Sequence, residues 1–261
     1  MKNDNINNNK NGSNDKNGTL INFYCGLSAG IVSNLVCNPF DVVRINKQLS
    51  NPIKWNIPFL SRGLMTGFIT IPAFWSIYFD TYERLKINNN GYFSIINGFI
   101  ASNIASAITC PLFFIKLKNQ IQPDFNIISF YKQNGIKPFY TGLNQTLIIN
   151  GSFIIQMPFY EKFKENRKLI QLINNDTLRI FIVSAVSKII ASCVFYPMDT
   201  IRAIQRGNHK LTTLNIISNL NKNPLKYYSG MSVYLMRSIP YYSSTFCTFE
   251  YTKKLITENK N

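Results

Sequence analysis

Histidine, acidic residues and paired cysteines are scarce in this chain, and their scarcity excludes most kinds of active site. The chain of 261 residues has one histidine, His209, and only 12 Asp and Glu against 28 Lys and Arg. Its five cysteines form no Cys-x-x-Cys pair, which disfavours a disulfide framework or a zinc site. We expect His209 to be a solvated loop residue. We expect no metal, no cofactor and no enzyme, because no nucleophile–base set or phosphate loop is present.

Long runs of basic residues are also missing, although the formal net charge is +16. This charge suggests an anionic partner. A nucleic-acid-binding protein would usually cluster its Lys and Arg, and the sequence contains no recognised nucleic-acid-binding module. Only 15% of the residues are charged, and they lie between long uncharged stretches, a spacing that favours a membrane protein. We therefore expect membrane lipid and an anionic small molecule as partners, and no nucleic acid.

Six stretches with at most one charge each are about as long as a membrane-spanning helix, which needs about 17–25 residues. Their frequent Ser, Thr, Asn and Gly are typical of helices with one face on lipid and another on a polar interior. The only charges inside them are Lys188 and Arg237. Residues 1–18, which are rich in Asn and Lys, are expected to be a disordered tail. The stretches are Leu20–Phe40, Gly63–Phe79, Gly91–Ile115, Pro138–Tyr160, Ile180–Met198 and Tyr227–Phe249.

Two motifs occur three times each, in alternation. In the odd stretches a proline is followed five places on by a basic residue, and the even stretches close on Tyr/Phe-Glu-x-x-Lys. Three copies of both motifs in order indicate three tandem two-helix repeats. We place repeats 1, 2 and 3 at 19–87, 88–166 and 167–255, between the tail 1–18 and a C-terminal tail, 256–261. The first motif runs Pro39–Arg44, Pro111–Lys116 and Pro197–Arg202, and the second ends in Glu83/Lys86, Glu161/Lys164 and Glu250/Lys253.

From about Leu20 to Lys254 these motifs resemble the signature of the mitochondrial carrier family. The signature is Pro-x-[Asp/Glu]-x-x-[Lys/Arg] on odd helices and [Phe/Tyr]-[Asp/Glu]-x-x-[Lys/Arg] on even helices. The resemblance implies an all-α membrane protein whose six transmembrane helices form a threefold pseudosymmetric bundle around a central cavity. It also implies a monomer in the mitochondrial inner membrane with cardiolipin as a lipid partner. Two positions depart from the repeat: Phe113 replaces an acid, and Arg206 stands where Gln48 and Gln120 recur.

The charged motifs are expected to form two gates. Prolines kink helices, so Pro39, Pro111 and Pro197 can bring the odd helices together at one end. Ion pairs of this kind are worth little net, because the Coulomb gain and the desolvation cost nearly cancel, which suits alternating access. By family analogy the matrix gate pairs Asp41 with Lys116 and Asp199 with Arg44, and leaves Arg202 without an acid. The cytoplasmic gate pairs Glu83 with Lys164, Glu161 with Lys253 and Glu250 with Lys86.

The family's substrate contact points fall on Thr70, on Ile149 with Asn150, and on Arg237. An Arg inside a span is a functional candidate, and a guanidinium suits phosphate or carboxylate, although a structural ion pair is the alternative for Arg237. Lys188 either serves the substrate or an interior ion pair, or extends towards the membrane surface. The run Pro111–Lys116 resembles carriers of NAD, FAD, folate and pyrimidine nucleotides. The runs Ser187–Ile189 and Ile154–Pro158 resemble the folate/FAD branch of that group.

The sequence therefore predicts an alternating-access transporter for an anionic, nucleotide-like cofactor. The alternative is a carrier-fold membrane adaptor that no longer transports. The two sets of gate motifs favour transport, because an adaptor has no need of alternating gates.

Overall fold

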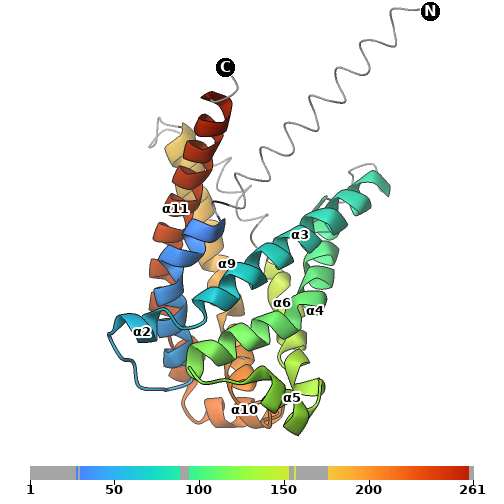
Figure 1. The fold of residues 1–261 in the computed structure, drawn as a ribbon, viewed down its shortest axis with the longest axis vertical. Helices are drawn as coiled ribbons and strands as arrows, with labels where there is room; N and C mark the ends of the chain where they lie inside the picture. Colours follow the sequence, from blue (N-terminus) through green and yellow to red (C-terminus); the bar gives the residue numbers. More distant parts are fainter. Residues whose placement is uncertain (1–27, 29, 89–93, 153–155, 157–175, 259–261) are drawn as a thin grey trace, which may run out of the picture.

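The computed structural model describes residues 28, 30–88, 94–152, 156 and 176–258, and within these ranges every regular element is a helix (Figure 1). The predicted all-α class is therefore confirmed. The long helices are residues 30–48, α3 (Leu64–Asn88), α4 (Ser94–Ile121), α9 (Asp176–Gly207) and α11 (Met231–Glu258), and α6 (Leu143–Asn150) is shorter. The connecting helices are α2 (Ile57–Leu60), α5 (Ile127–Asn134), η1 (Lys137–Tyr140), α10 (Thr213–Asn221) and η2 (Pro224–Tyr228).

The long helices lie closer together at one end of the molecule than at the other. Figure 1 shows α3 with α4 diverging from α9 with α11 towards the end where α11 finishes, while α5 and α10 lie at the opposite end. Pro111 and Pro197 lie inside α4 and α9, towards the ends that lead into α5 and α10, and Pro39 lies inside the helix 30–48. We call this the proline end.

Two even helices begin later than the uncharged stretches predicted. The stretches open at Pro138 and Tyr227, but both residues lie in short 3-10 turns, and α6 and α11 begin at Leu143 and Met231. The cause is the glycine before each helix, because Gly142 and Gly230 have φ values of 78° and 79°. This left-handed conformation is available to glycine without strain and interrupts helix propagation.

The same glycine recurs before α3, and the three glycines make equivalent contacts. Gly63 has φ 69°, and each glycine packs against the odd helix of the next repeat, with repeat 3 returning to the first helix. The approach is tight, so a side chain at these positions would force its neighbours to shift. A Cβ would lie 2.7 Å from Gln120 Cγ at Gly63, 3.1 Å from Arg202 Cγ at Gly142 and 3.1 Å from the Arg44 carbonyl oxygen at Gly230.

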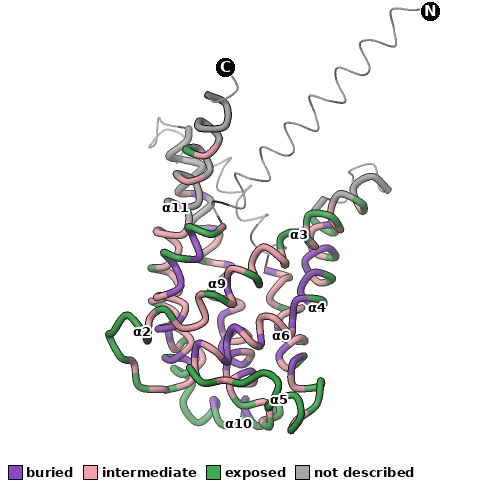
Figure 2. The backbone as a smooth tube through the Cα atoms, viewed as in Figure 1, coloured by how far each residue is buried: buried purple, intermediate pink, exposed green. Residues whose placement is uncertain are grey.

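Helix α4 exposes apolar side chains on one face and buries polar side chains among the apolar ones of the other face. Ile100, Ile104 and Ile108 form an exposed stripe, whereas Asn97 and Thr109 are each 1% exposed. Figure 2 shows these buried and exposed turns alternating along α4. A helix with this distribution suits lipid on one side and a polar interior on the other.

Among the described residues, two helical segments are long and apolar enough to cross a membrane: Ile57–Tyr82 and Ile95–Ile121, with mean hydropathies of 1.2 and 1.7. The six spans of the sequence analysis therefore stay a prediction. Polar residues are frequent in the remaining helices, as in α9 and α11.

Candidate functional site

Asp41 is the centre of one ion-paired cluster at the proline end. Its Oδ2 lies 3.7 Å from Lys116 Nζ of α4, and its Oδ1 lies 3.0 Å from Arg237 Nε of α11. The side chains of Asp41 and Lys116 are 15% and 10% exposed. The predicted partners Asp41 and Lys116 are thus brought together. Arg237, assigned to the substrate by analogy, lies on the same carboxylate in this conformation.

Asp199 is the centre of a second cluster. It forms ion pairs with Arg44 of the first helix and with Arg202, one turn further along α9. Gln48 Nε2 donates to Asp199 Oδ2 at 2.9 Å. The predicted partners Asp199 and Arg44 meet, but the expectation that Arg202 has no acid is wrong. Residues three apart lie on one helix face, so Arg202 reaches the carboxylate of its own repeat.

Aromatic rings hold the Arg44 guanidinium in addition to the carboxylate. Its central carbon lies 4.6 Å from the ring centroid of Tyr234 and 5.7 Å from that of Tyr196. These separations are within the range of cation–π attraction. The Tyr196 hydroxyl donates to the Ser229 carbonyl oxygen at 2.9 Å, which fixes that ring.

Hydrogen bonds to neutral acceptors link repeats 2 and 3 at the proline end. Arg206, which is 5% exposed, donates from Nε to the Thr141 carbonyl oxygen at 3.2 Å. Its Nη2 donates to Thr146 Oγ1 at 3.2 Å and to Cys110 Sγ at 3.7 Å.

Phe113, which stands at the acid position, packs edge-on against Phe74, with 6.0 Å between ring centroids.

His209 belongs to the same junction and is not the solvated residue that we expected. It is half-buried in the loop between α9 and α10, with Nε2 3.2 Å from Asn134 Oδ1 and its ring 5.1 Å from that of Phe130. Burial lowers the pKa of His209, and the positive charges of Lys118 and Lys210 lower it further. Its neutral form is therefore favoured in the folded state.

The five residues assigned to the substrate do not all reach one space. Thr70 is fully buried and donates to the Thr66 carbonyl oxygen of its own helix. Asn150 Nδ2 lies 2.9 Å from both Asn103 Oδ1 and Ser106 Oγ of α4. Arg237 forms an ion pair with Asp41. The side chains of Thr70, Asn150 and Arg237 are therefore engaged with other groups of the protein.

Ile149 and Lys188 line a cavity of about 120 Å³ between α6, α9, α11 and the first helix, which we call the α9 pocket. Sequence reasoning missed several of its residues, although Lys188, Ser192 and Tyr196 recur every four residues on one face of α9, a spacing that marks them in the sequence. Among the described residues, no group of three or more His, Cys, Asp or Glu could hold a metal ion. The other lining residues are Arg44, Ser152, Ser192, Phe195, Tyr196, Asp199, Arg202 and Tyr234.

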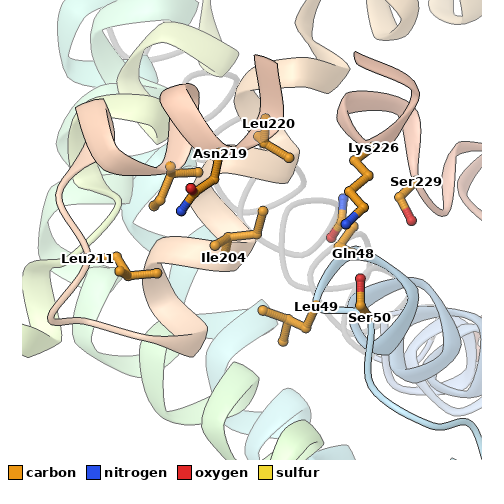
Figure 3. A pocket seen from close by; sticks show the side chains of 10 residues that line it. Gln48, Leu49, Ser50, Ile204, Leu211, Asn219, Leu220, Lys226 and Ser229 are labelled. Carbon is orange, nitrogen blue, oxygen red and sulfur yellow. The ribbon is translucent and has the colours of Figure 1, made fainter. Parts of the chain in front are cut away.

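A second cavity, of about 190 Å³, lies at the proline end between the end of the first helix and α9 and α10 (Figure 3). Half of its lining residues are aliphatic, such as Ile204, Leu211 and Leu220, and the other half are polar, with Lys226 as the charged one. Gln48 lines this cavity and also donates to Asp199, so the cavity adjoins the second cluster.

The structure does not describe the side chains of the cytoplasmic gate. Glu161 and Lys164 are not among the described residues, and for Glu83, Lys86, Glu250 and Lys253 the structure gives only their places in α3 and α11. The three predicted pairs of that gate therefore stay predictions.

Comparison with known proteins identifies related sequences over most of the chain. The family model described as mitochondrial carrier protein matches residues 88–169 and 174–260. The mitochondrial substrate carrier family protein W of Dictyostelium discoideum is 27% identical over 95% of this chain and 90% of its own length.

Two further relatives are named as nicotinamide adenine dinucleotide transporters. Mitochondrial transporter 1 of Saccharomyces cerevisiae is 27% identical over 89% of this chain and 76% of its own length. The chloroplastic transporter 1 of Arabidopsis thaliana is 26% identical over 93% of this chain and 94% of its own length.

Proposed function

The chain belongs to the mitochondrial carrier protein family, near its NAD carrier group, and on this premise we propose that it carries an anionic, nucleotide-like cofactor, with NAD as the first candidate. FAD, folate and pyrimidine nucleotides are the other members of the class. Its proposed place is the mitochondrial inner membrane, although one of the relatives named as a transporter is chloroplastic.

The observation that carries the proposal is the excess of basic over acidic groups at the proline end. Among the described residues, these groups share two carboxylates, and the set consists of Arg44, Lys116, Arg202 and Arg237 with Asp41 and Asp199. Buried cations are costly without sufficient counter-charge. An entering anion would relieve this excess, and guanidinium groups bind phosphate and carboxylate with matching geometry.

In the proposed mechanism the two clusters form the matrix gate, which is closed in this conformation. The equivalent contacts of Gly63, Gly142 and Gly230 support a threefold pseudosymmetric arrangement of six helices. An anion that attracts Arg237 and Lys116 also repels Asp41, so its arrival would weaken that cluster and favour opening. We assign substrate contact to Arg237, Lys188, Thr70, Ile149 and Asn150. Arg237 would be the first of the three engaged side chains to be released, because its partner is Asp41.

Uptake into liposomes tests the function. Purified protein reconstituted into vesicles should accumulate labelled NAD above the level of protein-free vesicles, and unlabelled substrate should compete. FAD, folate and pyrimidine nucleotides in parallel assays identify the substrate within the class. Failure of all four, with a folded protein verified by cooperative thermal unfolding, would refute the proposal and favour the adaptor alternative.

Arg237 variants test the site. Arg237→Ala should reduce uptake at least tenfold, and Arg237→Lys should also be poor, because an ammonium lacks the bidentate geometry of a guanidinium. Arg84→Ala, which removes an exposed cation from α3, is the matched control. Normal uptake by Arg237→Ala would remove Arg237 from the site.

A further inference from the structure

The α9 pocket has a charge pattern of its own. Three of its lining residues are basic, Arg44, Lys188 and Arg202, and one, Asp199, is acidic. Three positive charges less one negative leave a surplus of two on the lining. The remaining polar groups are hydroxyls, including those of Ser152 and Ser192, which are both buried. Cationic groups combined with hydroxyl donors are the usual ligands of a phosphate group.

The single carboxylate is shared between two guanidinium groups. Arg44 forms an ion pair with Oδ2 of Asp199, and this oxygen also accepts a hydrogen bond from Gln48. Arg202 forms an ion pair with the other oxygen, Oδ1. Arg44 has two tyrosine rings in addition. The side chain of Arg202 is also the more exposed of the two, at 23% against 13%. Arg202 is therefore the guanidinium best placed to accept another anion.

The repeat explains why Arg202 has this spare capacity. In repeat 1 the acid of the motif, Asp41, pairs with the base of repeat 2, Lys116. The equivalent acid for Arg202 would stand at position 113, where the chain has phenylalanine, and Phe113 packs against Phe74 instead. No carboxylate from repeat 2 reaches Arg202 among the ion pairs of the described residues.

We propose that the α9 pocket binds a phosphate group of the transported molecule, and in a dinucleotide the diphosphate, with Arg202 and Lys188 as its principal cationic ligands. The phosphate supplies Arg202 with the anion that Phe113 does not. The pair of negative charges on a diphosphate matches the surplus of two on the lining. This assignment rests on the proposed function, and it places the phosphate part of the substrate in the α9 pocket.

The size of the pocket limits the assignment to that part. Its volume of about 120 Å³ is below the roughly 300–1,000 Å³ of sites that enclose a whole drug-sized ligand. The nucleoside portions would therefore lie outside it, towards the end of the bundle where the helices diverge. Ser192 Oγ donates to the Tyr234 hydroxyl at 3.4 Å, a long bond that a phosphate oxygen could replace.

Thermal unfolding of the purified protein with inorganic pyrophosphate tests the pocket without any transport step. A ligand that binds only the folded state raises its stability, so the wild type should show a rise in Tm on the order of 3 °C at about ten times Kd. Sodium chloride at equal ionic strength is the reference for screening. Lys188→Gln and Arg202→Gln should lose most of this rise, and Lys188→Arg should keep it.

Lys222→Gln is the matched control, because it removes one exposed Lys charge at the end of α10; it should keep the full rise. Absence of a pyrophosphate effect in the wild type, or an equal effect in Lys188→Gln, would overturn the assignment. NAD in the same assay separates the two proposals. Stabilisation by NAD alone would leave the transport proposal standing and remove the pocket. Stabilisation by pyrophosphate alone, lost in the pocket variants, would keep the pocket and remove NAD as the transported molecule.

Discussion

At the proline end, the junction between repeats 1 and 2 and the junction between repeats 2 and 3 are built from different chemistry. The first contains the ion pair of Asp41 and Lys116, to which Arg237 adds a second cation. The second contains hydrogen bonds from cations to neutral acceptors. Lys118 Nζ donates to the Gly207 carbonyl oxygen at 2.7 Å, and Arg206 donates to Thr141, Thr146 and Cys110.

The two departures from the repeated motif both fall at this second junction. Phe113 removes the acid that would pair with Arg202, and Arg206 replaces the recurring glutamine. A long cation in place of glutamine restores a cross-repeat link without a carboxylate. An entering anion repels a carboxylate but not a carbonyl or hydroxyl oxygen. The comparison teaches that an anionic substrate can weaken the Asp41 ion pairs of the first junction, while the hydrogen bonds of Arg206 and Lys118 hold the second junction together.

The largest expected effect comes from removing the carboxylate of the first junction. Asp41→Asn leaves Lys116 and Arg237 buried without a counter-charge, which should cost about 3–5 kcal/mol of unfolding free energy and lower the thermal unfolding midpoint strongly. Asp80→Asn is the control within the chain, because Asp80 and Arg84 form an exposed pair, with side chains 63% and 77% exposed. That control should change stability by only about 0.2–1 kcal/mol. Equal shifts in the two variants would show that burial gives the Asp41 cluster no special weight.

Arg206→Gln, which copies the other two repeats, probes the second junction. It removes donors from Thr141 and Thr146, and bonds made by a charged group contribute about 1.5–3 kcal/mol each. We expect a moderate fall in the unfolding midpoint that is nearly the same at low and high salt, because the acceptors are neutral. Asp41→Asn should behave differently, with its defect changing as salt screens the two cations. A stabilised Arg206→Gln variant would mean that the buried charge costs more than its bonds contribute.

Phe113→Asp should make the second junction resemble the first. The new acid would give Arg202 a partner in repeat 2, and a solvated pair adds roughly 0–1 kcal/mol. The balance should shift towards the state closed at the proline end, since small free-energy differences set such populations. Single cysteines near each end, in a cysteine-free background, report the shift by their labelling rates. Phe113→Asn controls for the loss of the ring, and identical labelling of the two variants would deny the charge any role.

The smallest effect concerns His209, at the edge of the second junction. Its pKa in the folded protein is lowered below the ordinary value of about 6.5, so the unfolded chain binds more protons near that pH. Its contribution to stability is therefore present above pH 6.5 and is lost as the pH falls. Unfolding midpoints at pH 7.5 and pH 5.5 should differ more in the wild type than in His209→Gln. The same pH dependence in both proteins would assign the effect to other groups.

The sequence predicts the all-α class, and its resemblance to the carrier family implies the partners Asp41–Lys116 and Asp199–Arg44, which the structure brings together. It does not predict that Arg237 meets Asp41, since these residues lie in different repeats and their approach depends on how α11 is rotated about its axis. The role of Arg206 was also missed. A single departure from a repeat shows that the position differs. It does not show which acceptors Arg206 meets, because these come from the residue after η1, from α6 and from α4.

The α9 pocket could be predicted only in part. Lys188 stood out because a charge inside an apolar stretch is rare, whereas Tyr196, Tyr234 and Ser152 have no sequence feature that separates them from other residues in their helices. The helix periodicity of α9 groups Lys188 with Ser192 and Tyr196, but the residues of α6 and α11 that complete the pocket are joined to them by packing alone.

The contacts of the three left-handed glycines form a closed ring, in which repeat 1 contacts repeat 2, repeat 2 contacts repeat 3, and repeat 3 contacts repeat 1. This ring cannot close until the last repeat has been synthesised. Arg44 packs against Gly230 and pairs with Asp199, which follows it by 155 positions in the sequence. At about 5–20 residues per second, Asp199 is synthesised roughly 8–30 s after Arg44. During that interval the first repeat has no third repeat to pack against, whatever its contacts with the second. The closing of the ring therefore waits for translation, and no faster pairing of neighbouring repeats can shorten it.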